Sequence, residues 1–240
     1  KTIEIINNNA KEIEGKIRYP RGYGDDGWCE YQETPFSTGA FETYYWSQDP
    51  ADRTAAGTSP WQDYLDGKDP DYPIKALRSD FGQLRSKMDM MEADLSTPDS
   101  RMSDDMNRIN PATIDALTRL MLGGLPPGRD GYPLHCRLRY FDPTRQRAGI
   151  PIDVCALVTS MDANSVSVEL VNLNQVESRT VVVQGGAYAE HQITDISTDG
   201  QTSSVNATHF SVNLAPAAGA TIHVKMQRYS NLPTLAFPWA

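Results

Sequence analysis

The spacing of apolar residues along this chain of 240 residues changes once, and that change limits the folds open to it. Before residue 125, apolar residues recur every three or four positions, as in amphipathic helices. After residues 125–133, a linker with three prolines and two glycines, they recur at every second position, as in half-buried strands. The sequence therefore predicts an α+β protein with an α-helical domain with long loops, residues 1–132, and a β domain, residues 133–240.

The helical half contains one segment with an uninterrupted apolar rhythm. From Ile74 to Leu95 the spacing alternates between three and four residues over six turns, which predicts a long amphipathic helix. A later helix is expected to begin with Asn110 as N-cap, to bury Ile114, Leu117 and Met121, and to stop at Gly123–Gly124. Weaker patterns predict helices over residues 2–17, 37–47 and 61–65, with the rest of 48–73 as loop.

The second half contains seven short segments with strand-like alternation, separated by turn residues. Strands at this spacing indicate an antiparallel β-sandwich of the jelly-roll or immunoglobulin-like kind. The expected strands are 134–141, 152–159, 166–172, 179–184, 188–194, 209–214 and 221–226. The tail at 232–239 is apolar but contains two prolines, which a central strand does not accept. We expect the tail to pack back across the helical part.

Charge and cysteine usage exclude some classes of function. The net charge is −9, and residues 1–132 hold 23 acidic and 15 basic side chains, which argues against a nucleic-acid partner. No apolar run is long enough for a membrane span, so a soluble protein is expected. Cys136 and Cys155 are interpreted as two buried free thiols, with a bridge between them as the alternative, and this leaves the compartment unknown, periplasmic and secreted locations included.

The first residues of the chain favour a processed protein. Residues 1–4 are no signal peptide, and the chain begins without methionine inside an apparently helical pattern. We therefore interpret it as a mature or processed piece that lacks an N-terminal segment.

The stretch Gly22–Trp46 combines carboxylates, glycines and large aromatic rings, a mixture that no hydrophobic core requires. The candidate catalytic residues are Asp25, Asp26, Glu30 and Glu33. Glycoside cleavage uses two carboxyl groups on opposite sides of the scissile bond, about 5 to 10 Å apart. The alternative is a solvated acidic turn, followed by a helix whose first turn carries glutamate.

Aromatic rings in and near this stretch are candidate platforms for sugar rings, although such residues more often belong to a core. The candidate substrate-binding residues are Trp28, Tyr31, Tyr45, Trp46 and Trp61. No metalloprotease, hydrolase, P-loop or dinucleotide fingerprint occurs, so no cofactor is expected. The aspartates in residues 63–71 lack the order and the closing glutamate of a calcium loop.

Histidines occur only in the second half, where one of them has an acidic neighbour. Glu190–His191 is a candidate polar pair at a sheet rim, whereas His135 and His223 are interpreted as core or edge residues.

Three segments of the β half carry a family resemblance: 165–174, 178–184 and 214–224. They resemble the accessory β-sandwich that closes many bacterial carbohydrate-active enzymes. The helices before them are similar to the last hairpins of an (α/α)6-toroid glycosidase or polysaccharide lyase. The resemblance implies that the chain is the C-terminal part of such an enzyme. Since four or so helices cannot close a twelve-helix toroid, a partner chain or a missing N-terminal segment would have to complete the helical domain.

Two functions follow from these observations. The first is a part or subunit of a carbohydrate-active enzyme with a carbohydrate ligand, acid/base carboxylates and aromatic platforms. The alternative is a non-catalytic binding or assembly protein whose aromatic loops and apolar tail contact a partner chain. An enzyme requires two carboxylates that face one concave pocket, whereas an interface protein would present the same aromatic rings on a broad flat patch.

Overall fold

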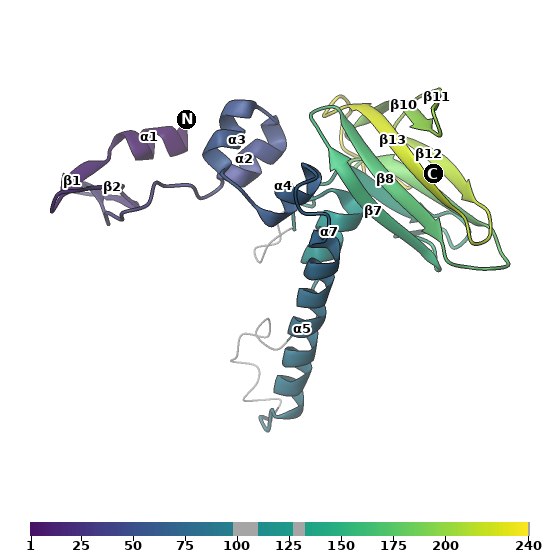
Figure 1. The fold of residues 1–240 in the computed structure, drawn as a ribbon, viewed down its shortest axis with the longest axis horizontal. Coiled ribbons are helices and arrows are strands. Elements are labelled where there is room, and N and C mark those ends of the chain that lie inside the picture. The colour runs from purple at the N-terminus through teal and green to yellow at the C-terminus, as the bar shows by residue number, and fades with distance from the viewer. Residues whose placement is uncertain (98–109, 127–132, 240) are drawn as a thin grey trace. The chain divides into compact units, whose positions relative to one another are not determined.

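The computed structural model describes residues 1–97, 110–126 and 133–239, in which the chain divides into two compact units, Lys1–Ser59 and Pro60–Ala240 (Figure 1). The first unit contains α1 (Thr2–Asn8), β1 (Lys11–Ile13), β2 (Lys16–Arg18), β3 (Gly22–Gly24), β4 (Gly27–Cys29), α2 (Ala40–Ser47) and α3 (Pro50–Ala56). The second begins with α4 (Pro60–Leu65), α5 (Tyr72–Glu92) and α7 (Asp115–Leu122). The domain boundary predicted at 132/133 lies inside this second unit.

The first unit differs most from its predicted secondary structure. Instead of one helix over 2–17, the chain forms the short α1 and then the β1–β2 hairpin. The asparagine run at 7–9 weakens the helix, and Glu14 and Gly15 both have positive φ, 56° and 76°, as a two-residue hairpin turn requires. The prediction missed this turn because the isoleucines on both sides of it recur at helical spacing. Farther along, α2 begins at residue 40 instead of 37, and α3 forms inside the predicted loop because Asp49 accepts a hydrogen bond from Ala51 N at 2.8 Å.

The helices of the second unit confirm the long apolar pattern and correct a shorter one. The predicted helix at 74–95 is α5, and the one at 61–65 is α4. The predicted C-terminal stop of α7 is also confirmed, since Gly123 is left-handed with φ 58°. However, α7 begins four residues later than the Asn110–Pro111 start, and it buries Ala116, Thr118 and Leu120 rather than Ile114 and Leu117. The helix lies against β7 and β5, and this packing, not the apolar period, selects its buried face.

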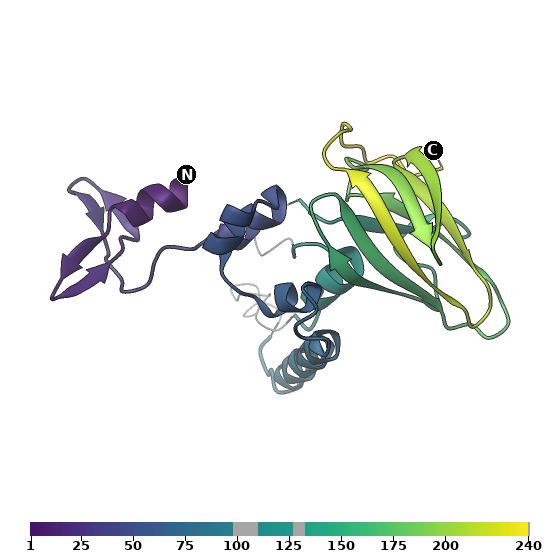
Figure 2. The ribbon, with the colours of Figure 1, turned by 45° about the horizontal axis from the view of Figure 1, so that its top comes forward.

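The predicted β-sandwich is confirmed as two antiparallel sheets (Figure 2). One sheet has the order β11-β10-β13-β8-β7, and the other β12-β9-β5-β6. The strands are β5 (Leu138–Asp142), β6 (Arg147–Ala148), β7 (Val154–Met161), β8 (Ser165–Asn172), β9 (Arg179–Gly185), β10 (Gln192–Thr198), β11 (Gln201–Ala207), β12 (His209–Leu214) and β13 (Gly219–Gln227). Alternate residues of β8 and β13 face inward, as the period of two predicts.

Four strands depart from the expected set. The strand expected at 134–141 is β5, which starts only at Leu138. The segment expected as a strand at 188–194 becomes a turn at 188–191, and β10 starts only at Gln192. The polar β11 and the two-residue β6 were not predicted, because neither has an apolar face that alternation would reveal. Both lie at sheet edges, where one side of the strand remains unpaired.

The apolar C-terminal tail packs on the sandwich, not across the helical part as predicted. The stacked rings of Phe237 and Trp239, 5.2 Å apart, both meet the ring of Phe141 edge-on at 5.8 Å. Phe141 is buried and pairs in register with Val182 of β9. The tail therefore covers the outer face of the four-stranded sheet, which explains why β9 is buried on both sides.

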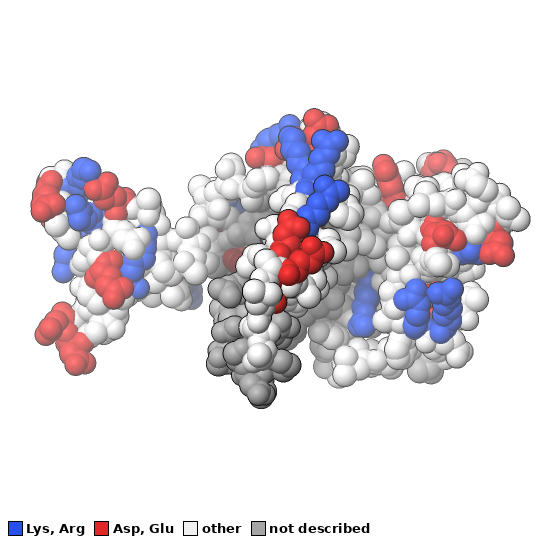
Figure 3. All heavy atoms as spheres, turned by 90° about the horizontal axis from the view of Figure 1, so that it is seen from below, with Lys and Arg blue, Asp and Glu red and all other residues white. Residues whose placement is uncertain are grey.

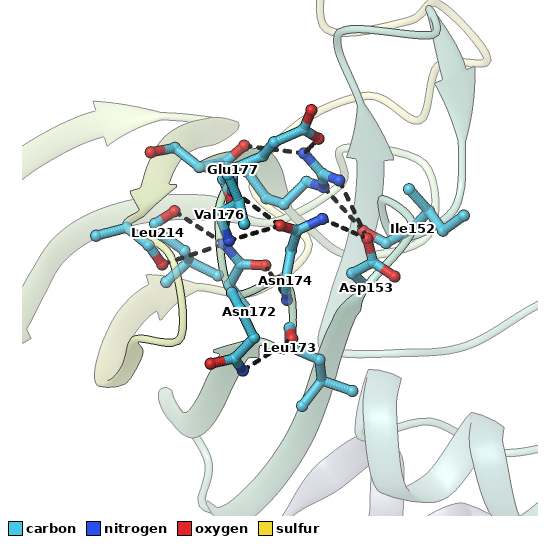
Figure 4. A network of polar contacts seen from close by, with 12 residues as sticks. Ile152, Asp153, Asn172, Leu173, Asn174, Val176, Glu177 and Leu214 are labelled. Atoms are coloured by element: carbon cyan, nitrogen blue, oxygen red, sulfur yellow. Dashed lines mark hydrogen bonds and ion pairs between the residues drawn. The ribbon is translucent and has the colours of Figure 1, made fainter.

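A polar network fastens the loop between β8 and β9 (Figure 4). Asn172 is buried, and its Nδ2 donates to the carbonyls of Glu177, Leu214 and Ala215 at 2.9–3.3 Å. At the rim, Arg179 bridges Asp153 at 3.0 Å and Glu177 at 2.7 Å. These bonds satisfy loop carbonyls that would otherwise lose their hydration on burial.

The network predicts that Asn172→Asp destabilises the protein by about 3 kcal/mol at neutral pH, because a carboxylate replaces the donor to three carbonyls. The loss should shrink at acid pH, where a protonated carboxyl group donates again. Urea unfolding measures both effects. Gln175→Ala on the same loop, whose side chain is exposed, is the control and should change stability by less than about 0.5 kcal/mol. Equal losses for the two variants would contradict the assignment.

Candidate functional site

The four predicted catalytic carboxylates lie on and beside the β3–β4 hairpin of the first unit. Asp25 and Asp26 form the tip of the hairpin and are exposed, and Glu30 follows β4 with φ 58°. Glu33 makes ion pairs with Lys16 at 2.9 Å and with Arg18 at 3.7 Å. Figure 3 shows this mixture of acidic and basic side chains over the hairpins, at the left. Glu33 therefore points to two cations of the β1–β2 hairpin.

The predicted aromatic platforms divide into core and surface residues. Tyr45 and Trp61 are each 3% exposed and belong to the cores of different units. Trp28 meets Tyr23 edge-on, with ring centres 5.0 Å apart, whereas Trp46 is 49% exposed on α2. The half-buried Tyr31 lies 5.3 Å from the Lys11 ammonium. Trp28, Tyr31 and Trp46 are thus the candidates that keep accessible ring surface.

A polar cavity of about 460 Å³ lies at the solvent-facing side of the five-stranded sheet. Its lining residues donate and accept hydrogen bonds: Asp162, Asn164, Ser165, Thr194, His223, Lys225 and Gln227, with Met226 beside them. A bulge in β10 between Ile193 and Asp195 interrupts the ladder at Thr194. Bulges of this kind redirect side chains. None of the predicted site residues contributes to this lining.

His223, which lines the cavity, is hydrogen-bonded to a serine of the neighbouring strand. Ser167 Oγ lies 3.0 Å from His223 Nδ1, because the two residues are register partners on β8 and β13. The Asp162 carboxylate accepts bonds from Asn164 N, Ser165 N and Ser165 Oγ at 2.7–2.8 Å, and these bonds hold its pKa below the usual value against the opposing effect of burial. The aspartate thus shapes the turn. Sequence reasoning missed the pair because strand register brings it together.

A second cavity, of about 300 Å³, lies beside the Asp153–Arg179 ion pair. Hydrogen bonds from Asn174 and Arg179 lower the pKa of Asp153. Glu177 and Arg179, which line this cavity, also fasten the loop at 172–177 (Figure 4). The Glu177 carboxylate and the Arg179 guanidinium bind each other, so we interpret their role as structural.

The predicted rim pair, Glu190 and His191, is buried. The Glu190 carboxylate accepts bonds from Ala187 N at 3.2 Å and Tyr188 N at 2.7 Å. It also fills the space beside Gly186, where a Cβ would overlap the Glu190 carboxyl group. His191 Nδ1 accepts from Tyr229 N at 3.1 Å, and burial, aided by the charge of Arg137, lowers the pKa of His191 to about 4. The pair fastens the turn at 186–191.

The second unit contains two cysteines, and the one in its core has an unreactive thiol. Cys136 and Cys155 are both free, as interpreted from the sequence, but only Cys136 is buried, whereas Cys155 is exposed. Burial raises the pKa of the Cys136 thiol, which keeps it protonated and unreactive.

The apolar face of α5 is exposed to an unusual degree. The sequence predicts a long amphipathic helix here, and in the structure α5 contains no buried residue. Ile74, Phe81 and Met88 are 55%, 60% and 47% exposed. Asp80, on the neighbouring side, accepts a bond from Ala116 N of α7 at 3.3 Å, and the rings of Tyr72 and Tyr64 lie 5.9 Å apart. These contacts anchor α5 and leave its apolar stripe uncovered by the described residues.

Comparison with known proteins adds one observation. A family model described as a domain of unknown function (DUF8034) matches residues 53–118, which include α4 and α5. No curated protein and no solved structure matches the chain. Within the described residues, no group of three or more histidine, cysteine or acidic side chains is placed to hold a metal ion, and no helix there has the length and apolar content to cross a membrane.

The buried His191 predicts a loss of stability in mild acid. The unfolded chain takes up this proton near pH 6.5 but the folded chain only near pH 4, so stability is complete above pH 6.5 and falls as the pH drops toward 4. The expected loss is about 3 kcal/mol. Urea unfolding across this range measures it, with His209→Gln as control and His191→Gln as the variant that flattens the profile. An NMR titration midpoint of His191 near 6.5 would contradict the assignment.

Proposed function

We propose that this chain is a non-catalytic assembly protein that binds a partner helix through the apolar stripe of α5. The observation that carries the proposal is the stripe itself, with Ile74, Phe81 and Met88 about half exposed along a helix of 21 residues. Apolar surface of this kind is costly in water and marks interaction sites. An amphipathic helix commonly binds through residues at this three-and-four spacing.

The rest of the second unit supports a role in presenting α5. Its base is held by α4 and α7, and α7 packs on the sandwich strands β5 and β7. Figure 1 shows α5 running away from the sandwich. A helix that is anchored at one end and projects from a rigid support offers its stripe to a partner without local unfolding.

Site-specific photo-crosslinking tests this role. A benzophenone amino acid placed at Phe81, on the stripe, should give covalent adducts when the protein is expressed in its native host. The same group placed at Ser86, an exposed position on the other side of α5, should give none. Equal yields at the two positions, or none at either, would exclude α5 as the contact surface.

Carbohydrate binding is the second candidate, as a subunit of a toroid-type glycosidase or lyase. It is favoured by the open rings of Trp28 and Trp46, the exposed carboxylates of the β3–β4 hairpin and the hydrogen-bonding cavity beside His223. Enzymatic action would require Asp25 or Asp26 to act with Glu30 or Glu33 across a substrate.

A glycan array with matched variants separates binding from turnover. If the hairpin binds sugar, Trp28→Ala should lower the signal at least tenfold, roughly the loss of one stacking contact, while His223→Ala leaves it unchanged. If the cavity binds sugar, His223→Ala should lower the signal and Trp28→Ala should leave it unchanged. Hydrolysis or elimination that disappears in Asp26→Asn and Glu33→Gln, with binding retained, would establish the enzyme. An array without any hit removes the carbohydrate candidate.

A further inference from the structure

We propose that the occupant of the α5 stripe is α5 of a second copy of this chain, in a parallel, in-register, two-stranded coiled coil. This inference rests on the proposed function, because it names the partner of the same surface. It depends on three observations: the heptad order of the apolar residues, the charges beside them, and the side of α5 that the rest of the unit leaves open.

The apolar residues of α5 fall on the two core positions of a heptad. Ile74, Phe81 and Met88 occupy the first core position, and Leu77, Leu84 and Met91 the second. A β-branched residue at the first position with leucine at the second favours two strands, which is the combination at the start of α5. The rhythm spans three heptads, and Leu95, 95% exposed, would begin a fourth.

The charges beside the stripe are complementary at every contact between parallel copies. The flanking positions hold Asp80 and Lys87 on one side, and Arg78, Arg85 and Glu92 on the other. In a parallel pair, Asp80 meets Arg85 of the second copy and Lys87 meets Glu92, and each contact forms twice by symmetry. All four contacts join opposite charges.

Antiparallel pairing would mix like and opposite charges. With Phe81 opposite Leu84 of the second copy, Arg78 would face Arg85 twice, while Asp80 would face Lys87 twice. With Leu84 opposite Met88, Lys87 would face Lys87 and Arg85 would face Arg85 of the second copy, while Arg78 would face Glu92 twice. Only the parallel arrangement joins opposite charges at every one of these contacts, so the charge order favours it.

The unit leaves this side of α5 open. Asp80 lies toward α7, because one of its carboxylate oxygens accepts a hydrogen bond from Ala116 N, while Leu77 and Leu84 are half-buried. Ile74, Phe81, Arg85 and Met88 are exposed around the neighbouring part of the helix surface. Successive residues turn by about 100°, which places a second helix roughly a quarter turn from α7, a separation that helix bundles accommodate.

Sedimentation of the purified chain over a wide concentration range tests the proposal. The expected result is a reversible dimer with twice the mass of one chain. Phe81→Glu should be monomeric throughout, whereas Ser86→Glu should dimerise like the wild type; circular dichroism confirms that both fold. Lys87→Glu should weaken the dimer about tenfold, and Lys87→Glu with Glu92→Lys should restore it.

Cysteine crosslinking tests the orientation. In a chain with Cys29→Ser and Cys155→Ser, which removes the exposed native thiols, Met91→Cys should oxidise to a covalent dimer. In the antiparallel arrangement Met91 faces Ile74 of the second copy, so crosslinks only in a mixture of Ile74→Cys and Met91→Cys chains would overturn the parallel assignment.

A monomeric wild type overturns the second copy as occupant, and a hydrophobic dye then separates this failure from that of the proposed function. If the monomer binds bis-ANS and Phe81→Glu does not, the stripe is an interface for a different chain. If the two bind dye equally, both proposals fail.

Discussion

The close contact between the end of α7 and the start of β5 is the constraint on which the second unit depends. A Cβ at Gly124 would lie 2.6 Å from the His135 carbonyl and 2.8 Å from the Cys136 side chain, so only glycine allows the approach. Leu125 N and Arg137 N then bond to the carbonyls of His135 and Leu122, and Tyr140 Oη donates to Met121 O at 2.7 Å. The helices and the sandwich therefore form one compact body, and the orientation of α7 sets where α5 begins.

Polar side chains that are buried inside this body also have hydrogen-bond partners. Glu190, His191 and Asn172 are each less than 9% exposed, and each has backbone groups as hydrogen-bond partners. These side chains form hydrogen bonds with backbone N–H and C=O groups of turns, which have no partner strand to supply such bonds. The Glu190–His191 pair that the sequence predicts at a sheet rim is thus structural, whereas the side chains beside His223 line a solvent-facing cavity.

The exposed stripe of α5 has the opposite status, since it has apolar surface without a partner among the described residues. Leu77 and Leu84 are half-buried, whereas the adjoining Ile74, Phe81 and Met88 are about half exposed. A short α7 of eight residues cannot cover a helix of 21 residues, and only the N-terminal half of α5 has this neighbour. The mismatch in length is the physical reason why a second molecule has a surface to bind.

Local pattern determined much of this protein. The change of apolar period determined the α+β class and the sandwich, the rhythm from Ile74 to Leu95 determined α5, and Gly123 determined where α7 ends. Tertiary structure decided what each face touches. Strand register joined Ser167 to His223, ion pairs drew Glu33 to Lys16 and Arg18, and the tail settled on Phe141 of the sandwich. Periodicity states only that a face is apolar; whether that face meets a core, a tail or another chain depends on residues that are distant in sequence and close in space.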